Sequence, residues 1–162
     1  MTARIVKIAV VFSLGVIMLL VALGNIFDYG ANFDVVQHVL SMDTVPETPL
    51  KWRAITSPWL HHLFYLVIIA TESITATLSL YGGVQLWRAR ATGAGAFNAA
   101  KAVAVTGLAT GFLLYALGFM GVGGEWFLMW RSGPPYNLED AAFRFIGLLG
   151  LSLIFVSLPD VD

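Results

Sequence analysis

The stretch that decides the fold is IVKIAVVFSLGVIMLLVALGNIF, residues Ile5–Phe27. A helix rises about 1.5 Å per residue, so a helix over this run is long enough to cross a hydrocarbon core of about 30 Å. Lipid offers no partner to backbone N–H and C=O groups, and an uninterrupted apolar run of this length therefore indicates a helix. Three more runs have the same character, namely Leu63–Trp87, Ala102–Gly124 and Ala141–Leu158.

The composition agrees with a chain that lies mostly in lipid. Apolar residues make up 58% and charged residues 12% of the sequence, and this charged fraction is about half that of an ordinary soluble domain. The alternation expected of a membrane β-barrel is absent. We predict an all-α polytopic membrane protein, a single antiparallel bundle of four transmembrane helices over residues 1–162, with a short interfacial helix in the first outer loop. The predicted spans are about 5–27, 59–87, 99–122 and 141–158.

The sequence excludes several kinds of chemistry. It contains no cysteine, which rules out disulfides, thiolate metal sites and a cysteine nucleophile. A net charge of −1 gives no electrostatic basis for binding nucleic acid. Because the chain has no Walker, HExxH or GxSxG motif, we assign no catalytic residue and favour a role other than that of an enzyme.

The positive charges predict the orientation of the bundle. With four spans, five cations fall on the side of the termini, namely Arg4, Lys7, Arg88, Arg90 and Lys101. Four fall on the opposite side, namely Lys51, Arg53, Arg131 and Arg144. The positive-inside rule then places both termini in the cytoplasm. The basic start of the chain also fits a signal peptide, but the apolar run continues past the small residues of a possible cleavage site, and we expect an uncleaved helix.

The two loops on the opposite side, about 28–57 and 125–140, are long enough to build a structured outer cap. Hydrophobic residues at helical spacing predict a short helix over Asn32–Met42, with Asn32 as its N-cap. We expect the two loops to pack on each other above the bundle. The link that we hypothesise is an ion pair of Arg53 or Arg131 with Asp28, Asp43 or Glu125.

Glu72 is the residue that most needs an explanation, because it lies near the middle of the second span. A carboxylate that faces lipid there is costly, so the side chain should face the interior, be neutral or be paired. It shares a helical stripe with Ala76, Ser79 and Gly83, small residues that permit close helix packing. Two interpretations stay open, a structural hydrogen bond between helices and a group that relays protons or binds a ligand.

The three histidines, His38, His61 and His62, all map to the outer side. Because His61 and His62 point about 100° apart on a helix, they should not both bind one ion. We favour hydrogen bonding at the membrane interface, and we assign no metal site and predict no cofactor. The alternatives are a divalent metal, held by one of these two with His38 and Asp43 or Glu125, and a bound quinone.

The candidates for function are polar side chains inside the bundle or near its outer end. They are Asn25, Asp28, His38, Asp43, Arg53, His61, His62, Glu72, Glu125 and Arg131.

Three segments carry a resemblance to a known family: NIFDYG at residues 25–30, HVLSMDT at 38–44 and GEWFLMWRS at 124–132. Together they resemble a bacterial family described only as predicted small integral membrane proteins of unknown function. The likeness extends over essentially the whole chain, including its length and its four spans. It implies a multi-pass protein of the bacterial inner membrane, and it brings no established activity, cofactor or catalytic residue.

These observations favour a non-enzymatic accessory component that binds lipid or a protein partner through its outer cap. Membrane lipid is the expected partner, with another membrane protein or a second copy of the chain as alternatives, and nucleic acid is not expected. The first alternative function is a quinone- or metal-binding subunit of a membrane oxidoreductase. The second is a small oligomeric transporter that uses Glu72.

Overall fold

The computed structural model describes residues 2–161 and consists of helices joined by short connections. Within those residues there is no strand. The elements in chain order are α1 (Thr2–Phe27), α2 (Tyr29–Ser41), the 3₁₀ turn η1 (Pro49–Arg53), α3 (Pro58–Ala89), α4 (Ala94–Ala99), α5 (Ala102–Leu113), the π-helical η2 (Leu114–Trp126), the 3₁₀ turn η3 (Met129–Arg131) and α6 (Glu139–Ser157).

Four helical segments are long and apolar enough to cross a membrane, which confirms the predicted fold class. They run over Thr2–Phe27, Pro58–Ala89, Ala94–Trp126 and Glu139–Ser157. The third segment contains α4, α5 and η2 in succession, with a turn between α4 and α5.

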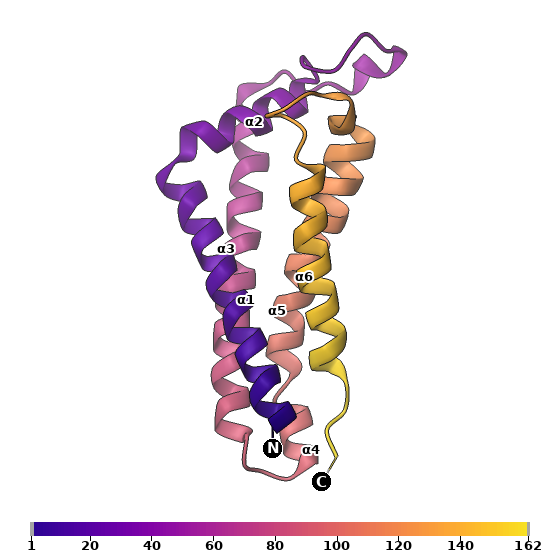
Figure 1. Ribbon diagram of the computed structural model, residues 1–162. Helices are drawn as coiled ribbons and strands as arrows, with labels where there is room; N and C mark the ends of the chain where they lie inside the picture. Colours follow the sequence, from indigo (N-terminus) through magenta and orange to yellow (C-terminus); the bar gives the residue numbers. More distant parts are fainter. Residues whose placement is uncertain (1, 162) are drawn as a thin grey trace.

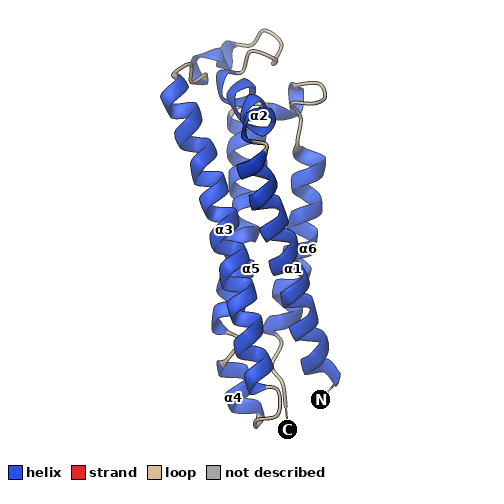
Figure 2. Ribbon diagram, turned by 90° about the vertical axis from the view of Figure 1, so that its left-hand side faces the viewer, coloured by secondary structure: helices blue, strands red, loops and turns tan. Residues whose placement is uncertain are grey.

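The four spans run up and down in chain order (Figures 1 and 2). α3 packs between α1 and α5, while α6 packs on α5 and η2. Both termini and α4 lie at one end of the bundle, which we call the terminal end (Figure 1). α2 and the loops that carry η1 and η3 lie at the other end, which we call the cap end.

α3 and α5 approach each other closely because glycines lie in the contact. A Cβ on Gly82 would lie 2.5 Å from the backbone nitrogen of Ala104, and one on Gly107 would lie 2.8 Å from that of Ser79. Real Cβ atoms do not come this close to backbone, so only glycine fits at these positions. The small residues of the second and third spans therefore serve packing within the chain.

α2 is the short helix predicted in the first loop, but its predicted start is wrong. The helix begins at Tyr29, with Asp28 as its N-cap residue. Because the chain leaves α1 at Phe27 and needs only Asp28 to turn, no longer linker separates the two helices. Asn32 therefore lies in the first turn of α2, where its amide donates to the Asp28 carbonyl oxygen at 3.4 Å instead of capping the helix.

The two loops of the cap end pack on each other, as expected, through a second apolar core that we call the cap core. The hydroxyls of Thr44 and Ser132 lie 2.9 Å apart and join the same two loops. Met42 and Leu128 adopt left-handed backbone conformations (φ 53° and 57°), and their side chains are buried. The buried members of the cap core are Val39, Leu40, Met42, Val45, Phe127, Leu128 and Met129.

The prediction of an ion pair between the loops is wrong, because within residues 2–161 neither Arg53 nor Arg131 forms one with Asp28, Asp43 or Glu125. Arg53 donates from Nη1 to the Trp126 carbonyl oxygen at 3.3 Å, and its guanidinium carbon lies 4.5 Å from the centre of the Trp126 ring. The Arg131 guanidinium lies 6.0 Å from the Trp130 ring. Asp43 is held instead by His38, at 2.8 Å. The arginines thus lie against indole rings, and contacts between apolar side chains supply most of the joint between the loops.

The glycine contact gives a first prediction. Gly107→Leu should lower the free energy of unfolding by about 1–3 kcal/mol, because the new side chain forces α3 and α5 apart. Gly147→Leu on α6 is the matched control, since no atom lies within 4 Å of a Cβ at Gly147. Thermal unfolding in detergent measures both variants. Equal midpoints for the two would show that the α3–α5 contact is not as close as described.

Candidate functional site

Glu72 lies inside the bundle and is only 2% exposed, as its stripe of small residues predicts. Its Oε2 accepts a hydrogen bond of 2.7 Å from Nδ2 of Asn25 on α1. The Tyr115 hydroxyl on η2 also faces this carboxyl. The partners of Glu72 are therefore neutral donors from two neighbouring helices.

The polar network continues from Asn25 toward the cap end. The Tyr65 hydroxyl donates to the backbone oxygen of Asn25 at 3.0 Å and to its Oδ1 at 3.3 Å. Tyr29 packs edge-on against Tyr65, with 4.7 Å between the ring centres, and its hydroxyl lies 2.8 Å from Nδ1 of His62. Asn25 and Tyr29 are half-buried and His62 is exposed, so the network reaches the surface where α1 turns into α2.

Toward the terminal end, the face of α3 that carries Glu72 continues with two buried hydroxyls. Thr75 and Ser79 are 0% and 1% exposed. In the described part of the chain their hydroxyl oxygens have no hydrogen-bond partner. They face Gly111 and Gly107 of α5, so the close helix contact begins directly below the carboxyl.

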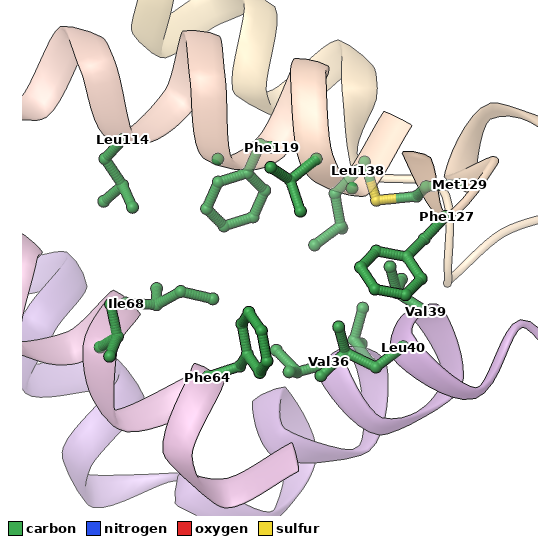
Figure 3. A pocket seen from close by; sticks show the side chains of 15 residues that line it. Val36, Val39, Leu40, Phe64, Ile68, Leu114, Phe119, Phe127, Met129 and Leu138 are labelled. Carbon is green, nitrogen blue, oxygen red and sulfur yellow. The ribbon is translucent and has the colours of Figure 1, made fainter. Parts of the chain in front are cut away.

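A separate apolar groove lies between α2, α3 and η2 at the cap end (Figure 3). It encloses a volume of about 240 Å³. Phe64 and Ile68 of α3 face Leu114 and Phe119 of the third span across it (Figure 3). All the residues that line the groove are aliphatic, Phe, Met or Gly, so the groove offers no side-chain hydrogen bond to an occupant.

The groove exists because α3 and the third span diverge toward the cap end. α3 packs closely on α5 but only loosely on η2. The π form of η2 is marked by the bond from the Phe127 N–H to the Val122 carbonyl oxygen, 3.0 Å long and five residues apart. In this wider coil, residues four or five apart share a face, and Leu114, Gly118, Val122 and Phe127 all line the groove.

The histidines bind different partners. His61 is 4% exposed, and its Nε2 donates to the Ile55 carbonyl oxygen at 2.7 Å. His38 lies 2.8 Å from Asp43, and the third histidine meets Tyr29 as described above. Residues 2–161 contain no group of three or more His, Cys, Asp or Glu side chains placed to hold a metal ion.

The remaining candidates are dispersed over the cap end. Asp28 is exposed at the corner between α1 and α2, and Glu125 is exposed on η2. Arg53 and Arg131 lie against tryptophan rings. Of the candidate residues, the structure brings Asn25 and Glu72 together inside the bundle, and His38 and Asp43 together on the surface.

An ionic cluster at the terminal end was not predicted from the sequence. The Asp160 side chain is 7% exposed, and its Oδ2 lies 2.7 Å from Nζ of Lys7 and also accepts a bond from Nζ of Lys101. Both ammonium groups donate to the Leu158 carbonyl oxygen as well, at 2.7 and 2.6 Å. The cluster ties the chain beyond α6 to α1 and α5.

The charge of Asp160 depends on these contacts. Burial opposes ionisation, but the hydrogen bonds from Lys101 and Lys7 hold the pKa of the Asp160 carboxyl below its usual value. From the sequence alone, Lys7 and Lys101 are interpreted only as positive charges at the membrane interface. The one signal of burial was the position of Lys7 inside an apolar run.

The chain belongs to the family described as "Predicted small integral membrane protein (DUF2165)", whose model matches residues 3–159. No curated protein and no solved structure matches the chain. The matched region includes the four spans from residue 3 onward, the Glu72 network and the groove.

The ionic cluster gives a second prediction. Asp160→Asn should lower the free energy of unfolding by about 3–5 kcal/mol, because it leaves two buried ammonium groups without a counter-charge. Asp34→Asn is the matched control. The carboxylate of Asp34 is 55% exposed beside His38, and its loss should cost less than about 1 kcal/mol. Denaturation of both variants in detergent measures the difference.

The same cluster sets the response to acid. A lowered carboxyl pKa stabilises the fold at pH values above the pKa of the unfolded chain, and this stabilisation is lost as the pH falls through the pKa of folded Asp160. Wild-type protein should therefore lose stability in acid more steeply than Asp160→Asn does. Parallel acid curves for the two proteins would contradict the pairing.

Proposed function

We propose that this protein is a non-enzymatic, lipid-binding component of the bacterial inner membrane, and that the apolar groove at the cap end holds one acyl chain of a phospholipid. The observation that carries the proposal is the groove itself, an apolar space inside the outer half of a membrane-spanning bundle.

The chemistry of the lining supports an alkyl chain as the occupant. A space without hydrogen-bonding side chains accepts only a group that brings no polar atoms. The volume of about 240 Å³ is below the range of about 300–1,000 Å³ typical for drug-sized ligands. It is also too small for a partner helix, which measures about 10–12 Å across with its side chains. A single acyl chain is smaller than a drug-sized ligand and narrower than a helix, so it fits the groove.

The position of the groove supports a lipid of the surrounding bilayer. Phe64 and Val67 line the groove and are 36% and 54% exposed, so the groove opens on the surface of the bundle that faces lipid. An empty groove would leave its walls without partner atoms, and a chain that enters restores these dispersion contacts. Exposed Trp52, Trp59 and Trp126 lie near the cap end, where indoles mark the headgroup region.

The orientation is part of the proposal. Five cations near the terminal end against four near the cap end favour a cytoplasmic terminal end. The groove then lies in the periplasmic leaflet of the inner membrane.

The third prediction fills the groove. Gly118 lines it, and a Cβ there meets only Leu114 Cδ1, at 3.6 Å. Gly118→Leu should therefore fold normally, place its side chain where the acyl chain lies, and lose most of the phospholipid that co-purifies in mild detergent. Native mass spectrometry of the purified protein measures the retained lipid.

Gly121→Leu is the matched control for the groove. It lies on the same π-helical segment but outside the lining, and its Cβ would also have only ordinary contacts, with Leu117 Cδ1 at 3.5 Å. The control should retain lipid as the wild type does. Equal retention by both variants, or retention of a quinone in place of phospholipid, would contradict the proposal.

The fourth prediction tests the orientation. The chain has no cysteine of its own. Cysteine at Gly133, an exposed position of the cap end, should react with an impermeant thiol reagent in intact spheroplasts. Cysteine at Ala91, an exposed position of the terminal end, should react only after lysis. The reverse pattern would place the termini in the periplasm.

A further inference from the structure

We infer that Glu72 is a proton-binding site that opens to the cap side of the membrane and is closed to the terminal side. The site is separate from the proposed lipid binding, because none of Asn25, Glu72 and Tyr115 lines the groove. Phe64 and Ile68 line the groove, whereas Glu72 faces α1 and η2.

The surroundings of Glu72 can hold the carboxyl in either protonation state. Burial among apolar helices disfavours the charged form. The Asn25 amide donates a hydrogen bond to Glu72, which favours the charged form, and the Tyr115 hydroxyl faces the same carboxyl. A hydroxyl can also accept a bond from a protonated carboxyl, so Tyr115 remains a partner after the proton has bound. A proton can thus bind to Glu72 and leave again without leaving a buried polar group unpaired.

The route for a proton lies on the cap side. Asn25 is half-buried, near the end of α1, and it touches Glu72 directly. One side chain therefore separates the carboxyl from the surface. Tyr65 and Tyr29 extend the polar path along the α1–α2 corner, where Asp28 is exposed.

The terminal side is closed by the α3–α5 contact. Below Ser79, the Gly82–Ala104 approach leaves no space for water, since even a Cβ on Gly82 would lie 2.5 Å from the Ala104 backbone. The next buried polar side chain of the third span toward the terminal end is Lys101, the N-cap residue of α5. It lies six residues before Gly107, which is about 9 Å along the helix axis. Met18, Leu86 and Leu108 belong to the same buried apolar core of the bundle.

The elements packed around the site bring few polar groups to it. α1 supplies Asn25, and the lysines of α1 and α5 are held by Asp160 at the terminal end. α6 supplies the Phe145 ring, stacked on Tyr115 with 4.4 Å between centres. The titratable groups that interact with Glu72 are Tyr115 on η2 and Tyr65 on α3, and Tyr29 and Asp28 at the α1–α2 corner interact in turn with Tyr65.

The fifth prediction tests the site in proteoliposomes that are selected for one orientation through a label on Gly133→Cys. Infrared difference spectra follow the carbonyl band of a protonated carboxylic acid while the pH is changed on one side at a time. We expect a band that follows the pH on the cap side only. It should be absent in Glu72→Gln, which keeps the shape of the side chain, and present in Glu139→Gln, which removes another carboxyl of the cap end.

A second pair of variants tests the partner of the carboxyl. Asn25→Leu removes a donor to the charged form and should move the midpoint of the band upward by about one pH unit. Asn32→Leu is the matched control, because the Asn32 amide reaches only the Asp28 carbonyl oxygen, and it should leave the midpoint unchanged.

The results decide the inference in each case. A carboxylic acid band that is unaffected by Glu72→Gln, or one that follows the pH on the terminal side, would overturn it, and a purely structural Glu72 would show no titration in the folded protein. Should Glu72→Gln fail to fold, the comparison of Asn25→Leu with Asn32→Leu decides alone, and equal midpoints for these two would overturn the inference.

Discussion

The close contact between α3 and α5 is the constraint on which the rest of the structure depends. Lipid supplies no hydrophobic force that would press helices together, so their association relies on packing and on small residues that admit close approach. Gly82 and Gly107 provide this approach in the terminal half of the bundle. In the cap half the facing residues are bulky, such as Phe64 and Phe119, and the helices diverge. The tight half closes the bundle below Glu72, and the open half creates the groove.

Polar groups are distributed in accordance with this division. In the tight half the small hydroxyls of Thr75 and Ser79 fit between backbones. Where the close α3–α5 contact ends on the cap side, there is room for the Glu72 carboxyl and its partners from α1 and η2. A buried ionic cluster lies at the terminal end, where Asp160 joins Lys7 and Lys101. An ionic cluster at that end fixes the chain after α6 without placing a charge at the middle of the membrane, where it would cost most.

The sequence predicts the features that depend on local pattern, and it misses those that depend on tertiary contact. Apolar run length is sufficient to identify four spans, and the helical stripe of Glu72 is sufficient to bury it. The pairing of Lys7 with Asp160 joins residues 153 positions apart, and no local pattern indicates it. The expected ion pair of Arg53 is wrong because complementary charge alone does not show which neighbours the fold supplies. The groove could not be predicted either, because its walls come from elements far apart in the chain.

The π form of η2 determines which side chains face the groove. With about 3.6 residues per turn, an α-helix that continued from Leu114 would complete three turns near Glu125, and a carboxylate would face the apolar space. With hydrogen bonds five residues apart the turns are wider, and Phe127 takes that position instead. Glu125 is then exposed away from the lining. The π-helical form thus keeps the Glu125 carboxylate out of the groove. A segment that only had to span the membrane would not need this form. This argues that the apolar character of the groove is itself what the segment provides.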